Sequence, residues 1–165
     1  LFRSAVTTQP IDGLTLSASY YDFGQMGKAD GRQKKEGGSL AGNFSMGQFS
    51  VGYGETLHAP AIAMGGAAAT DVVQHYENSG YSIGFAVNDA LSISYTEENS
   101  EKKVKTKSVA NAITRANVEM EITTMDVAYT IGGATLSLSH SEASNDSYTT
   151  GDDTNETIAA ISLAF

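Results

Sequence analysis

The 165-residue chain contains no cysteine and only two prolines, and large apolar side chains are few. The missing cysteine excludes a disulfide framework and suits a protein that crosses an oxidising compartment. Hydrophobic residues make up 41% of the sequence, below the usual share for a globular protein, which predicts only a thin conventional core. No stretch approaches the roughly 18 consecutive apolar residues of a membrane helix. If the chain spans a membrane, it must therefore do so with strands.

Positive charge is also scarce, because 10 Lys and Arg stand against 19 Asp and Glu, and the formal net charge is -9. This argues against nucleic acid as a partner, since phosphate binding needs clustered basic side chains. Most basic residues fall in two groups without an alternating pattern, which we expect to be loops: Lys28, Arg32, Lys34 and Lys35, and Lys102, Lys103, Lys105 and Lys107.

What the sequence does contain is alternation of apolar and polar residues with a period of two, the pattern of a half-buried strand. In the stretch 14–20, for example, Leu14, Leu16 and Tyr20 share one face and serines the other. The pattern predicts an all-β fold of about nine strands, at 1–8 (partial), 14–20, 39–46, 49–54, 81–87, 91–96, 118–131, 134–140 and 158–165.

The segment 118–131 changes the parity of its apolar residues. Val118 and Ile122 have even numbers, whereas Met125 and Val127 have odd numbers. An extra residue in a strand produces such a change, so we expect a β-bulge near Thr123 and Thr124.

Connections between the predicted strands alternate in length. They are short at 9–13, 47, 88–90 and 132–133, and long at 24–36, 55–75, 97–116 and 142–155. In an antiparallel up-and-down sheet, every short turn then lies at one end and every long loop at the other. This sorting is typical of a transmembrane β-barrel, here as one domain over residues 1–165 without an internal boundary.

Aromatic residues follow the same division. Several lie on the apolar face of a strand within a few residues of a short turn, and with the last residue of the chain they predict one ring of aromatics at a membrane interface: Phe44, Phe49, Phe85, Tyr129 and Phe165. Tyr20 and Tyr95 lie toward the long loops and fit an opposite ring, while Tyr53 and Tyr81 are expected nearer the middle.

The stretch 8–20 combines a turn at Pro10, the pair Gly13 and Leu14, and a small-residue strand that ends in Tyr20. Together with the stretch 129–139 and the Phe-terminated last strand, it resembles the general diffusion porins of Gram-negative outer membranes. The resemblance implies the C-terminal part of a barrel of ~16–18 strands in the bacterial outer membrane, assembled as a homotrimer. The family's inward-folded constriction loop, expected in the N-terminal half, and its lumen ladder of Arg and Lys have no match here.

The face opposite the apolar one carries small polar residues that we expect to line a lumen. Hydroxyls and glycines can face water without blocking passage, which favours passive diffusion of small hydrophilic solutes and ions. The same small residues would also fit beneath a plug or loop. Asp126 would bias passage toward cations if it faces the lumen; the alternative is a surface position near the predicted bulge. The predicted lining residues are Thr15, Ser17, Ser19, Asn43, Ser45, Ser50, Ser82, Ser92, Ser94, Thr96, Asp126, Thr135, Ser137, Ser139 and Ser162.

Expected partners are outer-membrane lipid and small solutes. The two basic groups could also attract anionic solutes or lipopolysaccharide phosphates, although mixed charge in a solvated loop is the simpler interpretation.

Chemistry of other kinds finds little support in the sequence. His58, His75 and His140 have no nucleophile motif, zinc-ligand spacing or phosphate-binding glycine loop around them, so we predict no enzyme, metal or cofactor. The alternative function is that of a small closed eight-stranded barrel, an adhesin or structural surface protein. That alternative requires residues 1–8 not to be a strand and larger side chains to fill a narrow lumen.

Overall fold

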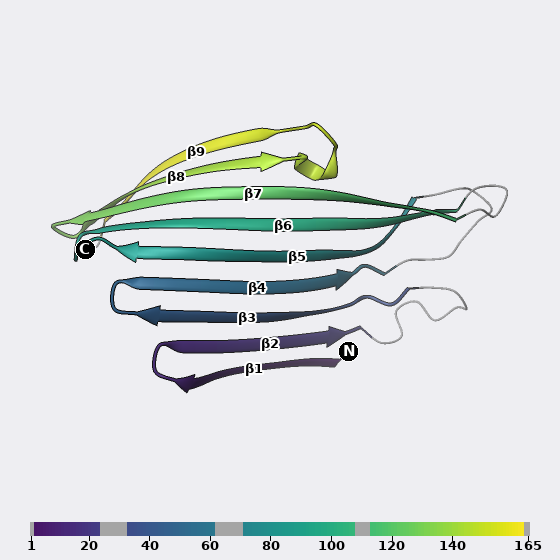
Figure 1. The fold of residues 1–165 in the computed structure, drawn as a ribbon, viewed down its shortest axis with the longest axis horizontal. Helices are drawn as coiled ribbons and strands as arrows, with labels where there is room; N and C mark the ends of the chain where they lie inside the picture. The colour runs from purple at the N-terminus through teal and green to yellow at the C-terminus, as the bar shows by residue number, and fades with distance from the viewer. Residues whose placement is uncertain (1, 24–32, 62–70, 108–112, 164–165) are drawn as a thin grey trace.

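The computed structural model describes residues 2–23, 33–61, 71–107 and 113–163, which form a single antiparallel sheet (Figure 1). Each strand pairs with its neighbours in the chain, in the order β1 to β9. The predicted all-β, up-and-down architecture is therefore confirmed. The elements are β1 (Phe2–Ile11), β2 (Leu14–Asp22), β3 (Glu36–Met46), β4 (Phe49–Ala59), β5 (Asp71–Ala86), β6 (Leu91–Lys107), β7 (Ile113–Ile131), β8 (Ala134–Ser144), the 3₁₀ turn η1 (Asp146–Tyr148) and β9 (Thr154–Leu163).

The only helical element in the described ranges is this three-residue turn. Within them, no helix is long and apolar enough to cross a membrane.

At the short turns, the strands begin and end close to the residues that the alternation predicts. At the opposite end of the sheet, they extend into the segments that were predicted to be long loops. β6 reaches Lys107 and β7 begins at Ile113, so most of the predicted loop 97–116 is strand. The expectation that the group Lys102 to Lys107 belongs to a loop is wrong. Backbone pairing with a neighbouring strand continues after the apolar alternation stops, because charged side chains in a strand can point into water. Lys28 and Arg32 of the other group lie outside the described residues.

The register of β7 is continuous from end to end. Glu101 pairs with Glu119, Tyr95 with Met125 and, at the short-turn end, Leu91 with Tyr129, without a shift. The bulge predicted at residues 123 and 124 is therefore wrong. The parity changes because the two ends of β7 place their apolar side chains on opposite faces, not because a residue is inserted.

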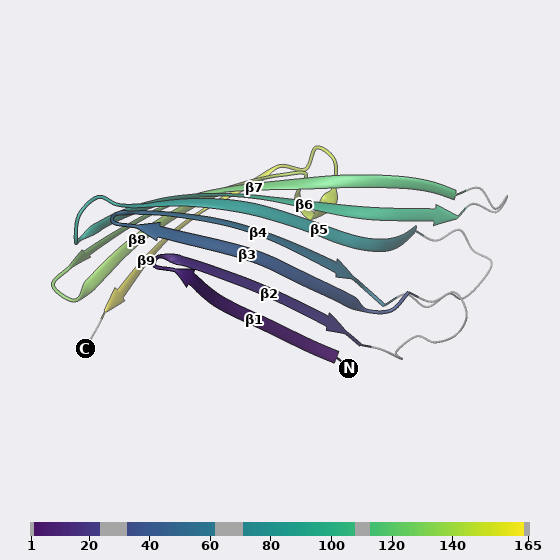
Figure 2. The same ribbon diagram turned by 60° about the horizontal axis from the view of Figure 1, so that its bottom comes forward.

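The sheet is twisted and curved into an open trough, with β1 and β9 as its two edges (Figure 2). It has no second layer, and Ala59, at 7% exposure, is the only apolar side chain that is buried among the described residues. Large apolar side chains stand exposed instead, Leu40 at 62% and Ile131 at 65%. The sheet is open and consistent with part of a barrel.

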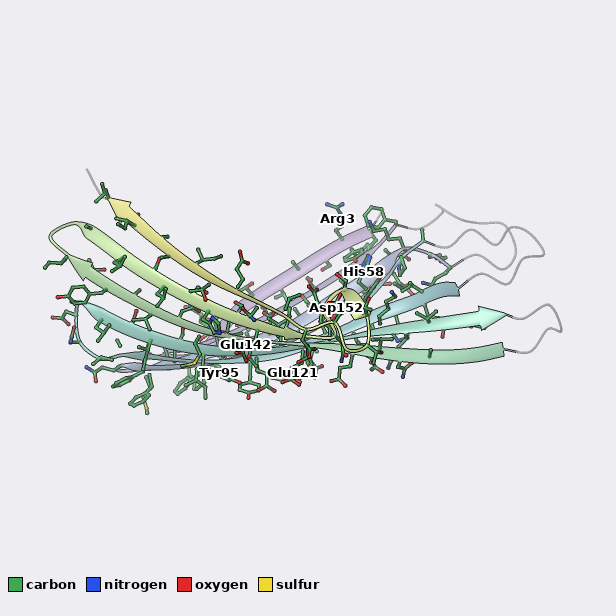
Figure 3. The ribbon with its side chains drawn as sticks, turned by 90° about the horizontal axis from the view of Figure 1, so that it is seen from above. Arg3, His58, Tyr95, Glu121, Glu142 and Asp152 are labelled. Carbon is green, nitrogen blue, oxygen red and sulfur yellow. The ribbon has the colours of Figure 1, made fainter. Side chains whose placement is uncertain are left out.

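Side chains divide between the two faces of this trough. Figure 3 shows Tyr95 and Glu121 on its convex side, and His58 and the segment of Asp152 on its concave side. Register then assigns the rest, because residues that pair across strands share a face. Leu16, Val51 and Ile83 join the convex face, and Ser17, Ser50 and Ser82 the concave face.

Gly13 and Gly47 are two of the turn glycines that have left-handed backbones, which explains the use of glycine at these positions. Gly13, at the β1–β2 turn, has φ +78°, and a Cβ built there would lie 2.2 Å from the carbonyl oxygen of Ser45. That close approach exists because the Ser45 amide donates to the Gly13 carbonyl at 2.9 Å. Gly47, between β3 and β4, has φ +59° but nothing within 4 Å of its Cβ position.

We predict that Gly13→Ala destabilises the protein more than Gly47→Ala. Both variants incur the left-handed strain of about 1–2 kcal/mol, but only Gly13→Ala also pushes β2 away from β3. Urea-induced unfolding of the full-length protein in detergent, followed by circular dichroism, measures both losses. Equal losses would contradict the close approach at Gly13.

Candidate functional site

The concave face holds every residue that was predicted to line a lumen. Across the sheet Thr15 pairs with Asn43, and in the next strands Ser82 pairs with Thr96. Asp126 pairs with Ser94 and with Ser139, so it lies on the same face. These positions come from eight strands, β2 to β9, and the register brings them into one continuous polar surface.

Hydroxyl groups on this face are hydrogen-bonded sideways to one another. Ser19 Oγ lies 2.7 Å from Ser39 Oγ, and Thr124 Oγ1 lies 2.9 Å from Ser141 Oγ. The Ser94 hydroxyl donates to Asp126 Oδ2 at 3.3 Å. Such cross-strand bonds hold short side chains along the wall, so the concave surface is polar and low in relief.

Glycine makes part of this wall flatter still. A Cβ on Gly84 would lie 2.5 Å from Ser50 Oγ, and one on Gly52 would lie 2.7 Å from Ser82 Oγ. The serine hydroxyls thus occupy space that a neighbouring side chain would otherwise fill.

Farther from the short turns, the concave face carries aromatic and cationic side chains. The Arg3 guanidinium and the Lys35 ammonium lie 5.5 Å and 4.9 Å from the centroid of the Phe23 ring. Tyr21 contacts that ring edge-on at 5.6 Å, and its hydroxyl is hydrogen-bonded to His58 Nδ1. We call these side chains, Arg3, Tyr21, Phe23, Lys35 and His58, the aromatic row. The sequence did not predict it, because Phe23 and His58 lie at the edges of segments without clear alternation. Continuing the period of Ser17 and Ser19 to Tyr21 would have indicated it.

On the convex face, aromatic rings gather close to the short turns. Phe49 and Phe85 pair across β4 and β5, with ring centroids 4.6 Å apart. Phe44 pairs with Val51, and Tyr129 with Leu91, on the same face. Phe165, the fifth member of the predicted ring, lies outside the described residues.

A second set of aromatics on the convex face shares one kind of hydrogen bond. The hydroxyls of Tyr81 and Tyr95 both donate to Glu97 Oε2, at 2.6 Å and 3.0 Å, and that of Tyr53 donates to Glu55 Oε1 at 2.5 Å. Tyr53 also pairs with Tyr81 across the strands. Contrary to the expectation that Tyr53 and Tyr81 lie nearer the middle, they border the glutamates together with Tyr95.

Beyond these tyrosines the convex face is charged. Lys103 Nζ lies 2.5 Å from Glu77 Oε2 and 3.3 Å from Glu101 Oε2. The hydrogen bond from Lys103 is the main reason that the pKa of Glu77 lies below its ordinary value. Lys102 lies on the concave face, where it pairs with Tyr76 of β5 and Val118 of β7. The basic residues of β6 are therefore divided between the two faces.

The three histidines have separate surroundings. His75 Nε2 lies 3.1 Å from Glu77 Oε1, and His140 Nδ1 lies 2.7 Å from Thr157 Oγ1. Among the described residues, no group of three or more side chains is arranged to hold a metal ion.

Comparison of the chain with protein-family models and with curated proteins finds no match.

The ion pair of Glu77 generates a prediction about pH. A carboxyl whose pKa is lowered on folding adds stability above its ordinary value of 4.5, and this contribution is lost as the pH falls below it. We therefore expect Lys103→Met to lose stability at neutral pH and to show a smaller further loss on acidification than the wild type.

Urea midpoints at neutral pH and below pH 4.5 measure this difference, with Lys103→Arg as the variant that keeps the charge. An acid-induced loss in Lys103→Met as large as that of the wild type would show that Lys103 does not act on Glu77.

Proposed function

We propose that this chain forms part of the wall of an outer-membrane porin, a channel for passive diffusion of small hydrophilic solutes and ions. The observation that carries the proposal is the distribution of polarity in the curved sheet. A band of apolar side chains covers its convex face, and small polar side chains cover its concave face. A water-soluble protein has the opposite arrangement, because it encloses its apolar side chains.

The convex band supports contact with lipid. Leu40, Ile83 and Ile161 are 62%, 49% and 71% exposed, and the sheet supplies no second layer to cover them. Removing such surface from water is worth on the order of 1 kcal/mol for each half-exposed large side chain. Summed over this face, the gain is on the order of tens of kcal/mol, which hydrocarbon would supply and water would not.

The limits of the band support two membrane interfaces. Near the short turns lie the phenylalanines of β3, β4 and β5, and at the other end lie the tyrosines whose hydroxyls reach glutamates. Aromatic side chains with a polar group favour the interface between hydrocarbon and water. The charged collar beyond Tyr81, with Glu77 and Lys103, would then face the aqueous side.

The concave wall supports diffusion rather than tight binding. Its hydroxyls and glycines offer weak hydrogen bonds to water or a passing solute, and Asp126 adds one fixed acidic group. A wall of this kind suits many small hydrophilic solutes better than one particular ligand.

A wide barrel fits this sheet better than the alternative of a closed eight-stranded barrel. Residues 2–11 form a strand, and nine strands curve only into an open trough whose edges, β1 and β9, do not pair with each other. We propose that further strands complete a barrel of ~16–18 strands, because a barrel in lipid cannot leave an edge unpaired. The homotrimer that the porin resemblance implies belongs to the same proposal.

Outer-membrane lipid on the convex face is the partner with most support. Binding of lipopolysaccharide phosphates through the basic group of β6 has less, since Lys103 is paired with Glu77 and Lys102 lies on the other face.

The direct test is single-channel recording with the purified full-length protein in planar bilayers. We expect stepwise currents that rise in proportion to salt concentration, and swelling of protein-containing liposomes in small sugars. A correctly folded protein that conducts nothing, and whose liposomes do not swell, would contradict the porin function and favour an adhesin or structural role.

The two faces can be compared by a matched pair of substitutions at adjacent residues. Ile83→Arg places a charge on the convex face between Val51 and Tyr95, and it should cost about 2–4 kcal/mol if that position lies in mid-membrane. Ser82→Arg places the same side chain on the concave face and should cost much less.

Urea-induced unfolding in lipid vesicles measures both. A larger loss for Ser82→Arg than for Ile83→Arg would reverse the assignment of the faces.

A further inference from the structure

The connection between β8 and β9 folds back over the concave face, where the ribbon carrying Asp152 lies inside the trough (Figure 3). Its contacts reach across β7 to the two strands beyond. The Tyr148 hydroxyl lies 2.6 Å from Ser100 Oγ of β6, and its ring centroid lies 5.5 Å from that of Tyr76 in β5. Lys102 Nζ lies 5.3 Å from the centre of the Tyr148 ring.

Hydrogen bonds within residues 145–153, which we call the inward segment, hold it in one shape. The Asn145 amide donates to Asp153 Oδ1 at 3.1 Å, and the Gly151 amide donates to Asn145 Oδ1 at 2.9 Å. The Asn145 side chain also donates to the Glu119 carbonyl of β7 at 2.9 Å. The segment is thus tied both to itself and to the sheet.

The backbone of the inward segment is strained where it meets the wall. Ser147 and Tyr148 have φ of 54° and 60°, in the left-handed region that a bulky residue such as tyrosine rarely adopts. Such a backbone is unfavourable for residues with a side chain, so the conformation persists only where contacts hold it. For Tyr148 those contacts are with Ser100, Tyr76 and Lys102.

The wall beneath is adapted to this segment. Val118, Met120 and Ile122 of β7 lie on the concave face, half-buried, and η1 packs against this strand. Nearer the short turns, β7 presents Thr124, Asp126 and Thr130 on the same face. Apolar residues therefore replace small polar ones on the concave side of β7 at the end where the segment lies.

We propose that the inward segment is a constriction element of the channel, and that Tyr148 is the positioning residue that docks it on β5 and β6 and so sets the size limit for solutes. The inference rests on the proposed porin function. Among the described residues, the segment gives the low-relief wall a projection into the lumen, and a projection into an open lumen reduces its cross-section.

The test uses the intact protein and Tyr148→Ala, which removes the ring and the hydroxyl, beside Tyr148→Phe, which removes only the hydroxyl. Asn155→Ala, an exposed change on the convex face of β9 just outside the segment, is the control. We expect Tyr148→Ala to raise single-channel conductance and to admit larger sugars in liposome swelling, Tyr148→Phe to do so to a smaller extent, and Asn155→Ala to match the wild type.

Docking is measured separately by proteolysis at the aspartates of the segment. Losing one hydrogen bond and the ring contacts should raise the cleavage rate about tenfold in Tyr148→Ala, because cleavage follows the population of the undocked form. Circular dichroism confirms that each variant folds, and Tyr148→Phe keeps the test decisive where Tyr148→Ala does not fold.

Each outcome bears on a different statement. A wild type that conducts, with Tyr148 variants of unchanged conductance and size limit, overturns the constriction while the porin function stands. Faster cleavage without a change in conductance overturns it as well, since the segment would dock without narrowing the lumen. A wild type that conducts nothing overturns both.

Discussion

The pairing register between neighbouring strands is the constraint on which the rest of this structure depends. Side chains alternate between faces, so a slip of one residue in a strand would move its leucines to the concave side and its serines to the convex side. From β2 to β5 the ladder runs without a shift. Short turns fix it: Gly13 allows β3 to approach β2, and Asn88 Oδ1 accepts the amides of Ala90 and Leu91 at 2.9 Å. The opposite polarity of the two faces is a consequence of this register.

Along a strand, the same backbone ladder can carry an apolar stretch and a charged stretch on its convex face. The ladder between β6 and β7 continues without interruption from Leu91 to Lys107. The convex side chains of β6, however, are apolar before Tyr95, as at Ile93, and polar or charged after it, as at Glu101. The backbone must keep its hydrogen bonds wherever it lies, whereas the side chains need only suit what they face. This separation explains why the strands extend past the apolar band, and why the band has a sharp limit at tyrosines whose hydroxyls bond to glutamates.

Because backbone pairing does not depend on the polarity of the side chains, only part of each strand could be predicted from the sequence. Within the band, alternation such as Leu14, Leu16 and Tyr20 indicated the strands and their faces. Beyond the apolar band the alternation stops, so the part of 97–116 that is paired in β6 and β7 was predicted as loop. In β7 the apolar side chains move from one face to the other, and this change was predicted as a bulge. The docking of Tyr148 depends on contacts with β6 and β5, which lie beyond the neighbouring strand β7. No local pattern encodes such contacts, and none marked the left-handed backbone of Tyr148.

A wall of short side chains cannot by itself discriminate between solutes, because a serine or glycine reaches only a little way from the backbone. If the concave face lines a channel, as we propose, selection by size requires backbone that leaves the wall. Leaving the ladder exposes backbone amides, and in the inward segment the amides of Asn145 and Gly151 donate to Asp153 Oδ1 and Asn145 Oδ1. The strain at Tyr148 then has a physical explanation: the segment must turn its ring back toward Ser100, and a left-handed backbone permits that direction. In the proposed channel, a hydrogen-bonded inward segment and a wall of low relief are therefore complementary requirements.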